Sequence, residues 1–477
     1  MLVYGIGSVL SRSLTFLVVP VLARSFSPED YGFIDLLLTT SAAALLIASL
    51  NFEPPLTRYY LDYKEKGRAE TIISTLLFVL FVSMGLVMAI SLVCWRSILG
   101  WLNIAAPRLD AACGMYFLAV LAVPAKLMNQ VLTVILRLER KAVAYAALTT
   151  LYGVVFLLLL VGVSLLHQLT IAAYFAIVLI AELSLLVGLW WTLRSKIFLS
   201  LRGFSPETAA LLLWFALQQA PSVVIGWVLL NANRFFMIHL SNLHEIGVYA
   251  FASKLMAVPG VLTTAFQMSW VPYYMSIYKA PDARERYAVI MRRYLTLFCI
   301  VVVLMTSLAP EIVLVVGTQE YAGAIPVMGI IGIALWLGQV WMFTHIGPLI
   351  SEKPWMLSLA QGGGFVVFLA ATWMLVKPLG AIGAGLALGA SWLVALMLVV
   401  FLAEKAYPIP YPYKKIAAVL VLLVGFTLLV NAAESLLWLR ASLVGIATIL
   451  TALLFNYRDL WPYLARQNRP PATTAGK

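Results

Sequence analysis

Two stretches of the chain share a pattern that sets the expected fold. Ser25–Leu38 reads SFSPEDYGFIDLLL, and Leu240–Leu255 reads LSNLHEIGVYAFASKL. In each stretch an acidic residue stands two positions before a glycine, and the two glycines, Gly32 and Gly247, are 215 residues apart. Proline and glycine between apolar runs are typical of turns. We therefore expect Glu29 and Asp30 to lie in a short external hairpin turn, with a similar turn at Gly247.

The apolar runs around these turns are too many for a soluble fold. Of the 477 residues, 63% are hydrophobic and only 11% are charged. About a quarter of the residues in a soluble domain are charged, and runs of roughly 18 or more apolar residues are typical of membrane-spanning helices. We expect an all-α integral membrane protein. Its first run lacks a basic flank and a cleavage site, which favours a retained helix over a signal peptide.

Breaks that are charged or rich in proline and glycine divide the apolar runs into about fourteen transmembrane helices. We expect them at residues 2–23, 32–52, 71–94, 110–136, 143–166, 170–193, 208–233, 246–270, 291–316, 323–350, 356–376, 380–403, 416–432 and 436–455. The last two runs are short, so twelve spans is the alternative.

The distribution of Lys and Arg supports this count. Alternate connections, taken with the C-terminal tail, hold 23 Lys and Arg residues, whereas the connections on the opposite side hold 6. Because cytoplasmic loops carry an excess of Lys and Arg, we expect a multi-pass protein of the bacterial inner membrane with both termini in the cytoplasm. The same rule accounts for the net charge of +12 without a nucleic-acid partner.

The repeated pattern also predicts how the spans are grouped. Aligning Asp30-Tyr31-Gly32 with Glu245-Ile246-Gly247 places six spans in each repeat, and an even number keeps both halves in the same orientation. The alternative is a chance recurrence of similar turns. We predict a six-helix lobe over 1–205, a parallel six-helix lobe over 206–403, an extra helix pair over 404–457 and a cytoplasmic tail over 458–477.

The connections leave little room for an enzyme. They are short and contain no Gly-rich phosphate-binding loop, which argues against an attached ATPase. Cys94, Cys113 and Cys299 show no metal-ligand spacing, and a Cys94–Cys113 disulfide is only an open alternative. We therefore predict no catalytic residues, no metal site and no cofactor.

Four segments, taken in order, resemble one family of membrane proteins. They are VVPVLARSFSPEDYGFIDL, EIGVYAFASKL, PEIVLVVGTQEYAGAIPVMGIIG and LGAIGAGLALGASWLVALML, and the resemblance covers most of residues 2–403. These segments look like polysaccharide-unit flippases of the O-antigen type. That family belongs to the multidrug/oligosaccharidyl-lipid/polysaccharide exporter superfamily, which also contains multidrug and toxin extrusion transporters and lipid II flippases. Asn233 stands where the family often has an acidic residue, so the chain departs from the pattern there.

The resemblance implies a secondary transporter that works by alternating access. Its substrate would be an undecaprenyl-diphosphate-linked oligosaccharide, flipped across the inner membrane for surface polysaccharides such as O-antigen, lipopolysaccharide or exopolysaccharide. Its partners would be this lipid-linked substrate, membrane lipids and the glycan polymerase machinery. A lipid II flippase and a multidrug or cation exporter of the same fold are the alternatives.

Three cations fall inside predicted spans, where an unpaired charge costs at least about 2.5–3.5 kcal/mol. Arg12, Lys126 and Lys254 lie in the first, fourth and eighth spans. A diphosphate crossing a low-dielectric region needs fixed cations in a water-filled lumen. We predict that these residues bind the anionic headgroup. Ion pairing between helices, or side chains that reach the membrane surface, is the alternative.

Two acids and several polar residues also fall inside spans. Asp35 and Glu182 are candidate coupling acids, because burial favours the protonated form of a carboxylate. The alternatives are a Glu182–Lys126 pair and an interfacial Asp35. Pro221 is expected to kink the seventh span, and further polar positions near a lumen site are Gln218, Gln219, Asn129 and Gln130.

Overall fold

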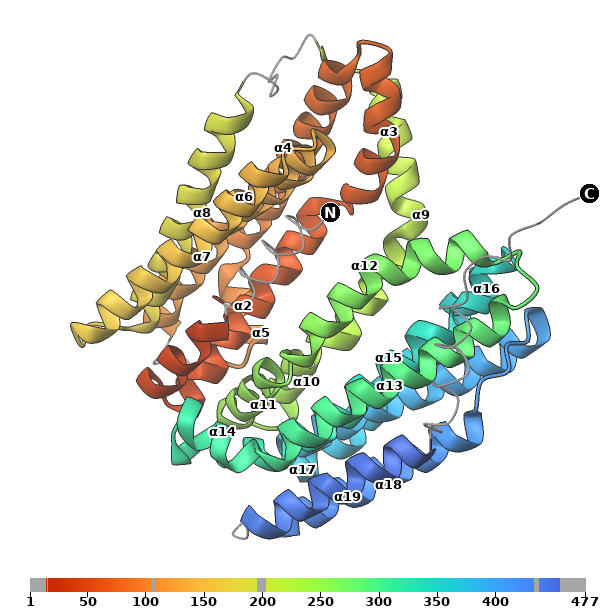
Figure 1. Ribbon diagram of the computed structural model, residues 1–477. Coiled ribbons are helices and arrows are strands. Elements are labelled where there is room, and N and C mark those ends of the chain that lie inside the picture. Colours follow the sequence, from red (N-terminus) through yellow and green to blue (C-terminus); the bar gives the residue numbers. More distant parts are fainter. Residues whose placement is uncertain (1–13, 15, 105–108, 195–202, 433–436, 455–477) are drawn as a thin grey trace, which may run out of the picture. The chain divides into compact units, whose positions relative to one another are not determined.

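The computed structural model describes residues 14, 16–104, 109–194, 203–432 and 437–454, and all regular structure in these ranges is helical (Figure 1). This confirms the all-α prediction. The helices are α2 (Pro28–Ser49), α3 (Glu53–Glu65), α4 (Ala69–Val93), α5 (Trp95–Trp101), α6 (Leu109–Leu138), α7 (Ala142–Leu165), α8 (Ile171–Leu193), α9 (Pro206–Asn231), α10 (Asn233–Leu240), α11 (Leu243–Leu255), α12 (Pro259–Ile277), α13 (Ala283–Ser307), α14 (Ala309–Val316), the 3-10 helix η3 (Gln319–Tyr321), α15 (Ala324–Thr344), α16 (Ile346–Ile350), α17 (Trp355–Ala406), α18 (Tyr413–Ala432) and α19 (Leu437–Leu454).

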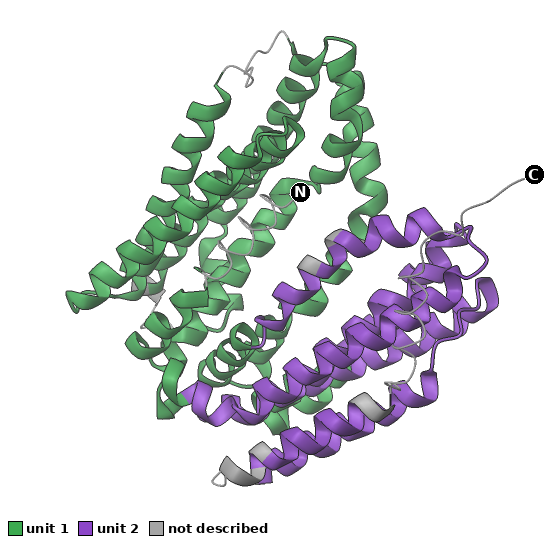
Figure 2. Cartoon of the chain, in the orientation of Figure 1, with its two compact units in different colours: residues 1–255, 314–321, 369–384 green, residues 256–313, 322–368, 385–477 purple. Residues whose placement is uncertain are grey.

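Two compact units divide the chain (Figure 2). Unit 1 comprises residues 1–255, 314–321 and 369–384, and unit 2 comprises residues 256–313, 322–368 and 385–477. Helices α2 to α11 therefore belong to unit 1. The two lobes predicted from the sequence repeat remain a prediction.

Many of the described helices can cross a bilayer. Nine of them are long and apolar enough by length and composition, and the number rises to eleven if each of two bent helix pairs forms one span. Two further described apolar helices, Phe16–Ser25 and Ser442–Thr451, are shorter. The described helices thus form a multi-spanning bundle, and fourteen remains a prediction.

Helix α17 combines two of the predicted spans. Its 52 residues would extend over roughly 78 Å at the α-helical rise, more than twice the bilayer core of about 30 Å. The backbone leaves helical geometry at Gly380, where φ is 52° and ψ is −125°. A break at this position agrees with the expected connection between residues 376 and 380.

The turn expected at Gly32 is instead a helix start. Helix α2 begins at Pro28, and the Ser27 hydroxyl accepts a hydrogen bond from the Asp30 backbone N–H at 3.2 Å. Helix α11 begins in the same way, with the Asn242 side-chain oxygen accepting from the Glu245 N–H at 3.0 Å. A capping side chain followed three residues later by an acid satisfies the unpaired N–H groups of a helix N-terminus. The repeated pattern is therefore a pair of helix caps.

Helix α3 occupies a segment that we expected to be a loop. It follows α2 after a break at Leu50 and Asn51, which both have positive φ. Its Lys64 forms an ion pair with Glu139 at 2.6 Å, and Tyr60 donates a hydrogen bond to the same carboxylate. These contacts fix α3 to the end of α6.

Unit 2 has an aromatic core. Trp270, Tyr294 and Phe343 each lie within stacking distance of Phe266, with ring centroids 4.2–5.8 Å apart. Elsewhere in this unit Arg440 bonds to Glu311 at 2.9 Å and to the Ser307 carbonyl oxygen at 2.9 Å. This pairing fixes α19 to the end of α13 and the start of α14.

Candidate functional site

The two stretches with repeated caps meet in unit 1, where α2 and α11 touch backbone to backbone. A Cβ atom added to Gly32 would overlap the Leu243 carbonyl oxygen, and one added to Gly247 would overlap the Pro28 carbonyl oxygen. Only glycine permits an approach this close. Both helices start at this crossing.

Beyond the crossing, a carboxylate and two cations come together. Arg234 donates through Nε to Asp35 Oδ2 at 2.9 Å, and Lys254 Nζ lies 3.2 Å from Asp35 Oδ1. The Asp35 and Arg234 side chains are only 7% and 9% exposed, whereas Lys254 is 30% exposed. Helices α2, α10 and α11 thus supply one member each to a buried cluster, which we call the Asp35 triad.

Aromatic rings cover the two cations. The Lys254 ammonium lies 4.6 Å from the centroid of the Tyr31 ring, and the Arg234 guanidinium lies 5.1 Å from that of Tyr249. Asn233 donates to the Tyr249 hydroxyl at 2.8 Å, which orients that ring. A cation over an aromatic face gains about 0.5–2 kcal/mol, and more where water is excluded.

Tyr321 of η3 belongs to the same aromatic group. It packs against Tyr31 and Phe251, with ring centroids 5.8 and 4.6 Å apart. Its hydroxyl donates to the Phe26 carbonyl oxygen at 2.9 Å. Burial raises the pKa of the Tyr321 hydroxyl, so the phenol stays protonated and keeps this bond.

The charges of the triad leave it with a net positive charge. One carboxylate faces two cations, and the Arg234 guanidinium is held further by a bond to the Leu230 carbonyl oxygen at 2.9 Å. The Lys254 ammonium has hydrogen-bond donors to spare after Asp35. Its partial exposure lets it reach a second acceptor. The triad can therefore hold an anion at Lys254 while Asp35 and Arg234 remain paired.

A second polar cluster lies inside unit 1 around Glu182. Asn129 donates to both the Glu182 carboxylate, at 2.8 Å, and the Glu182 carbonyl oxygen, at 2.9 Å. Tyr152 donates to the other carboxylate oxygen at 3.0 Å. Glu182 and Asn129 are both buried. Helices α6, α7 and α8 therefore enclose a carboxylate whose partners are neutral donors.

Lys126 lies one helical turn before Asn129 on α6 and is half-buried. It interacts electrostatically with Glu182, but it forms no ion pair within 4 Å and no hydrogen bond with the described part of the chain. The Oδ1 atom of Asn129 is also buried and has no hydrogen-bond partner among the described residues. The cluster thus keeps an available cation and an unpaired acceptor.

The remaining predicted site residues are dispersed. Arg12 lies outside the described residues. Gln218 is exposed and Gln219 half-buried on α9, which bends by 46° between Pro206–Pro221 and Val223–Asn231. Gln130 is exposed on α6. Among the described residues, no group of three or more His, Cys, Asp or Glu side chains could hold a metal ion, and the three cysteines are free.

Sequence reasoning missed Arg234 and the aromatic rings. We counted Arg234 among the external loop residues because it follows the apolar run that ends at residue 233. The structure ends α9 at Asn231 and starts α10 at Asn233, so Arg234 lies in a buried helix. Hydropathy alone carries no signal for this break. The pair Tyr31 and Tyr249 could have been noticed, since each neighbours a glycine of the repeat within two residues.

Comparison with known proteins identifies the family. A family model described as polysaccharide biosynthesis protein matches residues 1–278, more than half of the chain. No curated protein sequence matches the chain.

Solved structures show the same fold. A lipid II flippase, MurJ, in an inward closed conformation is 11% identical, with a TM-score of 0.74, and the match covers 96% of this chain and 100% of that one. An inward-facing multidrug resistance transporter of the MATE family, within the MOP superfamily, is 14% identical, with a TM-score of 0.65, and the match covers 83% and 94% of the two chains. At these identities the likeness concerns the fold.

Proposed function

The chain belongs to the polysaccharide biosynthesis protein family, and from that premise we propose that it flips a lipid-linked oligosaccharide across the bacterial inner membrane. The carrier is undecaprenyl diphosphate, and the product serves surface polysaccharide biosynthesis, as for O-antigen, lipopolysaccharide or exopolysaccharide. Transport proceeds by alternating access without a catalysed reaction. Glycan polymerase machinery then consumes the flipped substrate, and both termini of the transporter lie in the cytoplasm.

The Asp35 triad is the observation that carries the proposal. A diphosphate must leave water to cross the membrane, which requires fixed cations that are already held in place. Arg234 is buried and paired, so it stabilises Asp35, whereas Lys254 is partly exposed and keeps free donors. Lys254 therefore binds the diphosphate, and Lys126 and Arg12 add positive charge to the path.

Coupling to an ion gradient is assigned to the buried carboxylates. Glu182 is the better candidate of the two, because its bonds come from the neutral donors Asn129 and Tyr152. A proton on Glu182 would leave those partners in place. Asp35 is held between two cations, which stabilise its charged form.

Two other functions of this fold compete with the proposal. A lipid II flippase also carries a diphosphate, and the fold likeness to MurJ supports that candidate. A multidrug exporter for organic cations is disfavoured, because such a substrate would be repelled by the net positive triad. Complementation distinguishes a glycan flippase from a lipid II flippase. The gene should restore surface glycan to a strain that lacks its glycan flippase, and it should not rescue the growth of cells depleted of lipid II flippase.

The role of Lys254 can be tested directly by substitution. Lys254→Ala removes the anion-binding ammonium, while Arg234 still pairs with Asp35. We expect at least a tenfold loss of surface glycan at wild-type expression, consistent with loss of one charge-assisted hydrogen bond of about 1.5–3 kcal/mol. Lys254→Arg should retain most of the transport, since it keeps the charge.

Arg58→Ala is a matched control, because it also removes a cation that is paired with a carboxylate in unit 1, here on an exposed surface. It should leave surface glycan unchanged. Wild-type glycan in the Lys254→Ala variant would refute the anion-binding role. If the variant loses glycan only because the folded protein is less thermally stable, Lys254 acts by pairing with Asp35, and the anion-binding role is refuted as well.

A further inference from the structure

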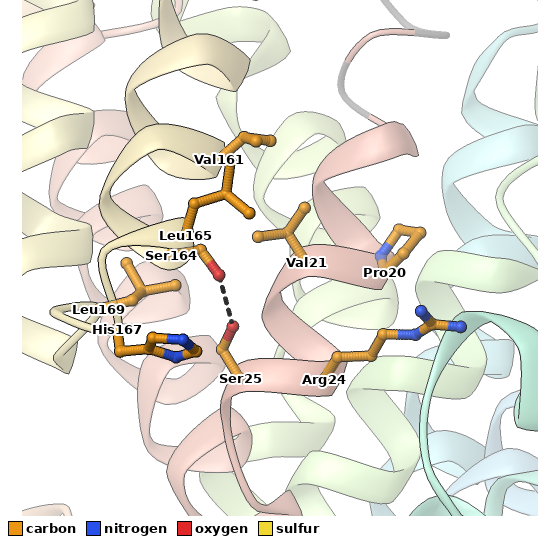
Figure 3. Close-up of a pocket in the computed structure, with 9 residues that line it drawn as sticks. All are labelled: Pro20, Val21, Arg24, Ser25, Val161, Ser164, Leu165, His167 and Leu169. Carbon is orange, nitrogen blue, oxygen red and sulfur yellow. Dashed lines mark hydrogen bonds between the residues drawn. The ribbon is translucent and has the colours of Figure 1, made fainter.

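A pocket with both polar and apolar lining lies in unit 1 and shares no residue with the Asp35 triad or the Glu182 cluster. Its volume is about 630 Å³, and it lies between the helix Phe16–Ser25, the end of α7 and the connection from α7 to α8 (Figure 3). The described residues that line it are Pro20, Val21, Arg24, Ser25, Val161, Ser164, Leu165, His167 and Leu169.

The polar groups of the pocket are suited to an anion. Arg24 uses one N–H for the Val315 carbonyl oxygen and has further donors available. The hydroxyls of Ser25 and Ser164 lie 3.2 Å apart, and Figure 3 shows the His167 ring beside Ser25. None of the described lining residues is acidic. A negatively charged ligand therefore meets donors and a permanent cation without a competing carboxylate.

The end of α7 determines where the His167 side chain lies. His167 has a φ of 56° just after the end of α7, in the left-handed region where glycine is the usual residue. Its N–H bonds to the Ser164 carbonyl oxygen at 2.9 Å and the Gln168 N–H bonds to the Val163 carbonyl oxygen at 3.2 Å, which closes the C-terminus of α7. The imidazole is exposed and directed along the pocket, where it is available to a ligand.

The position of the pocket along the bundle specifies the kind of anion. Helices α7 and α8 are both candidate membrane spans, and the pocket lies where α7 ends at Leu165 and shortly before α8 begins at Ile171. The ends of spanning helices lie at the level of the lipid headgroups. The apolar side chains of Val21 and Val161 lie together at the other end of the pocket in Figure 3.

We propose that this pocket binds the phosphate group of a membrane lipid. His167 and the two serine hydroxyls contact the phosphate oxygens, and the valines contact the first carbons of the lipid chain. Arg24, whose guanidinium extends away from the two hydroxyls in Figure 3 toward the Val315 carbonyl oxygen, supplies the positive charge. The inference does not depend on glycan transport. Two lipids carry the required chemistry, namely an anionic phospholipid and a diphosphate-linked isoprenoid.

Binding can be measured on the purified full chain by native mass spectrometry. The probes are phosphatidylglycerol with diacylglycerol as its phosphate-free match, and farnesyl diphosphate with farnesol as its match. Arg24→Gln removes the cation. His167→Asn removes the imidazole and keeps a residue that tolerates the left-handed backbone. Arg96→Gln is the control, because Arg96 is an exposed cation of α5 that stacks over Trp95 outside the pocket.

We expect each pocket variant to bind at least one phosphate probe about tenfold more weakly, as loss of a charge-assisted contact predicts. Arg96→Gln and the phosphate-free probes should show no change. Weaker binding of phosphatidylglycerol alone assigns the pocket to phospholipid, and weaker binding of farnesyl diphosphate alone assigns it to the isoprenoid carrier. Wild-type binding of both probes by His167→Asn and Arg24→Gln, or an equal loss in Arg96→Gln, would overturn the proposal.

Discussion

The contact between Gly32 and Gly247 shows how a single atom can determine helix packing. Each glycine faces a backbone carbonyl of the opposing helix, and backbone cannot rotate away as a side chain can. A methyl group at either position would separate α2 from α11. The Asp35–Lys254 pair, which lies beyond the crossing, depends on the same approach.

Gly32→Ala and Gly247→Ala should therefore destabilise the protein. We expect each to cost about 1–3 kcal/mol or more, the range for overpacking of a close contact. Because one separation of the helices relieves both clashes, the double variant should cost less than the sum of the two single variants. Thermal unfolding in detergent, followed by fluorescence-detected size exclusion, measures the stability lost in each single variant and in the double variant.

Gly85→Ala provides the control for helix propensity. Gly85 lies inside α4, and a Cβ there would meet nothing within 4 Å. Alanine stabilises a helix interior by roughly 1 kcal/mol relative to glycine. Equal melting temperatures for Gly85→Ala and Gly32→Ala would contradict the role assigned to the crossing.

Asp35 should be essential to the stability of its triad. Asp35→Asn leaves Arg234 and Lys254 facing each other without the carboxylate that now separates them. Breaking a buried ion pair costs about 3–5 kcal/mol, so we expect a large drop in the melting temperature. Adding Arg234→Met should recover part of the loss, because it removes the buried cation that lost its partner.

Asp62→Asn is the matched control for this experiment. Asp62 pairs with Arg58 at 3.1 Å on the exposed side of α3. Exposed pairs contribute at most about 1 kcal/mol, so its melting temperature should stay close to that of the wild type. A similarly small effect of Asp35→Asn would show that the triad is solvated rather than buried.

At the scale of elements, the break in α17 depends on a residue of α11. Glu245 accepts a hydrogen bond from the Ala381 backbone N–H at 2.8 Å, where the second segment of α17 begins. A Cβ on Gly380 would overlap the same carboxylate, and the positive φ of Gly380 also requires glycine. Glu245 thus belongs to the cap of its own helix and caps the broken helix as well.

Glu245→Ala should lower the free energy of unfolding by about 1–2 kcal/mol, the usual cost of losing a capping side chain. Glu245→Gln should recover most of this, since its amide oxygen can accept the same hydrogen bond. Limited proteolysis near Lys377, together with thermal unfolding, distinguishes the two variants. Equal losses for Glu245→Ala and Glu245→Gln would show that the negative charge, not the hydrogen bond, is what matters.

Some helices can be predicted from the sequence and others cannot. Spans such as α4 and α8 are long apolar runs, so their existence follows from composition. Helix α3 mixes charged and apolar residues in a short segment, and its stability comes from the contacts of Tyr60 and Lys64 with Glu139. Such tertiary contacts leave no pattern in the local sequence, which explains why we expected a loop.

At the scale of the whole molecule, hydropathy predicts which charges fall inside apolar helices, but not which side chains those charges contact. An intramembrane charge signals that it needs a partner, which drew attention to Asp35, Lys254 and Glu182. Hydropathy gives the position of a residue along a helix but not the neighbour it faces. For that reason Asp35 and Lys254 were assigned separate roles although they form one ion pair, and Asn129 was not linked to Glu182.

The orientation in the membrane yields a prediction for the complete chain. Single cysteines can be placed at exposed positions in a background in which Cys94 and Cys113 are Ser, since Cys299 is buried. The asymmetry of Lys and Arg predicts that Lys66→Cys and Lys279→Cys face the cytoplasm. A membrane-impermeant maleimide should label them only after lysis, whereas Arg96→Cys and Lys377→Cys should react in intact cells whose outer membrane is permeabilised.

This labelling also tests the span count, because each span reverses the side on which the next connection lies. Between Lys66 and Lys377 the prediction places nine spans, an odd number, so these two residues must label from opposite sides. If one bent helix returned to its own side, the order would be reversed for every later position. If α17 crossed once, Lys377 would lie inside that span and would react from neither side. Reaction of Lys377→Cys and Lys66→Cys from the same side would therefore refute the predicted arrangement, and comparison with Arg96→Cys and Lys279→Cys would locate the error to one half of the chain.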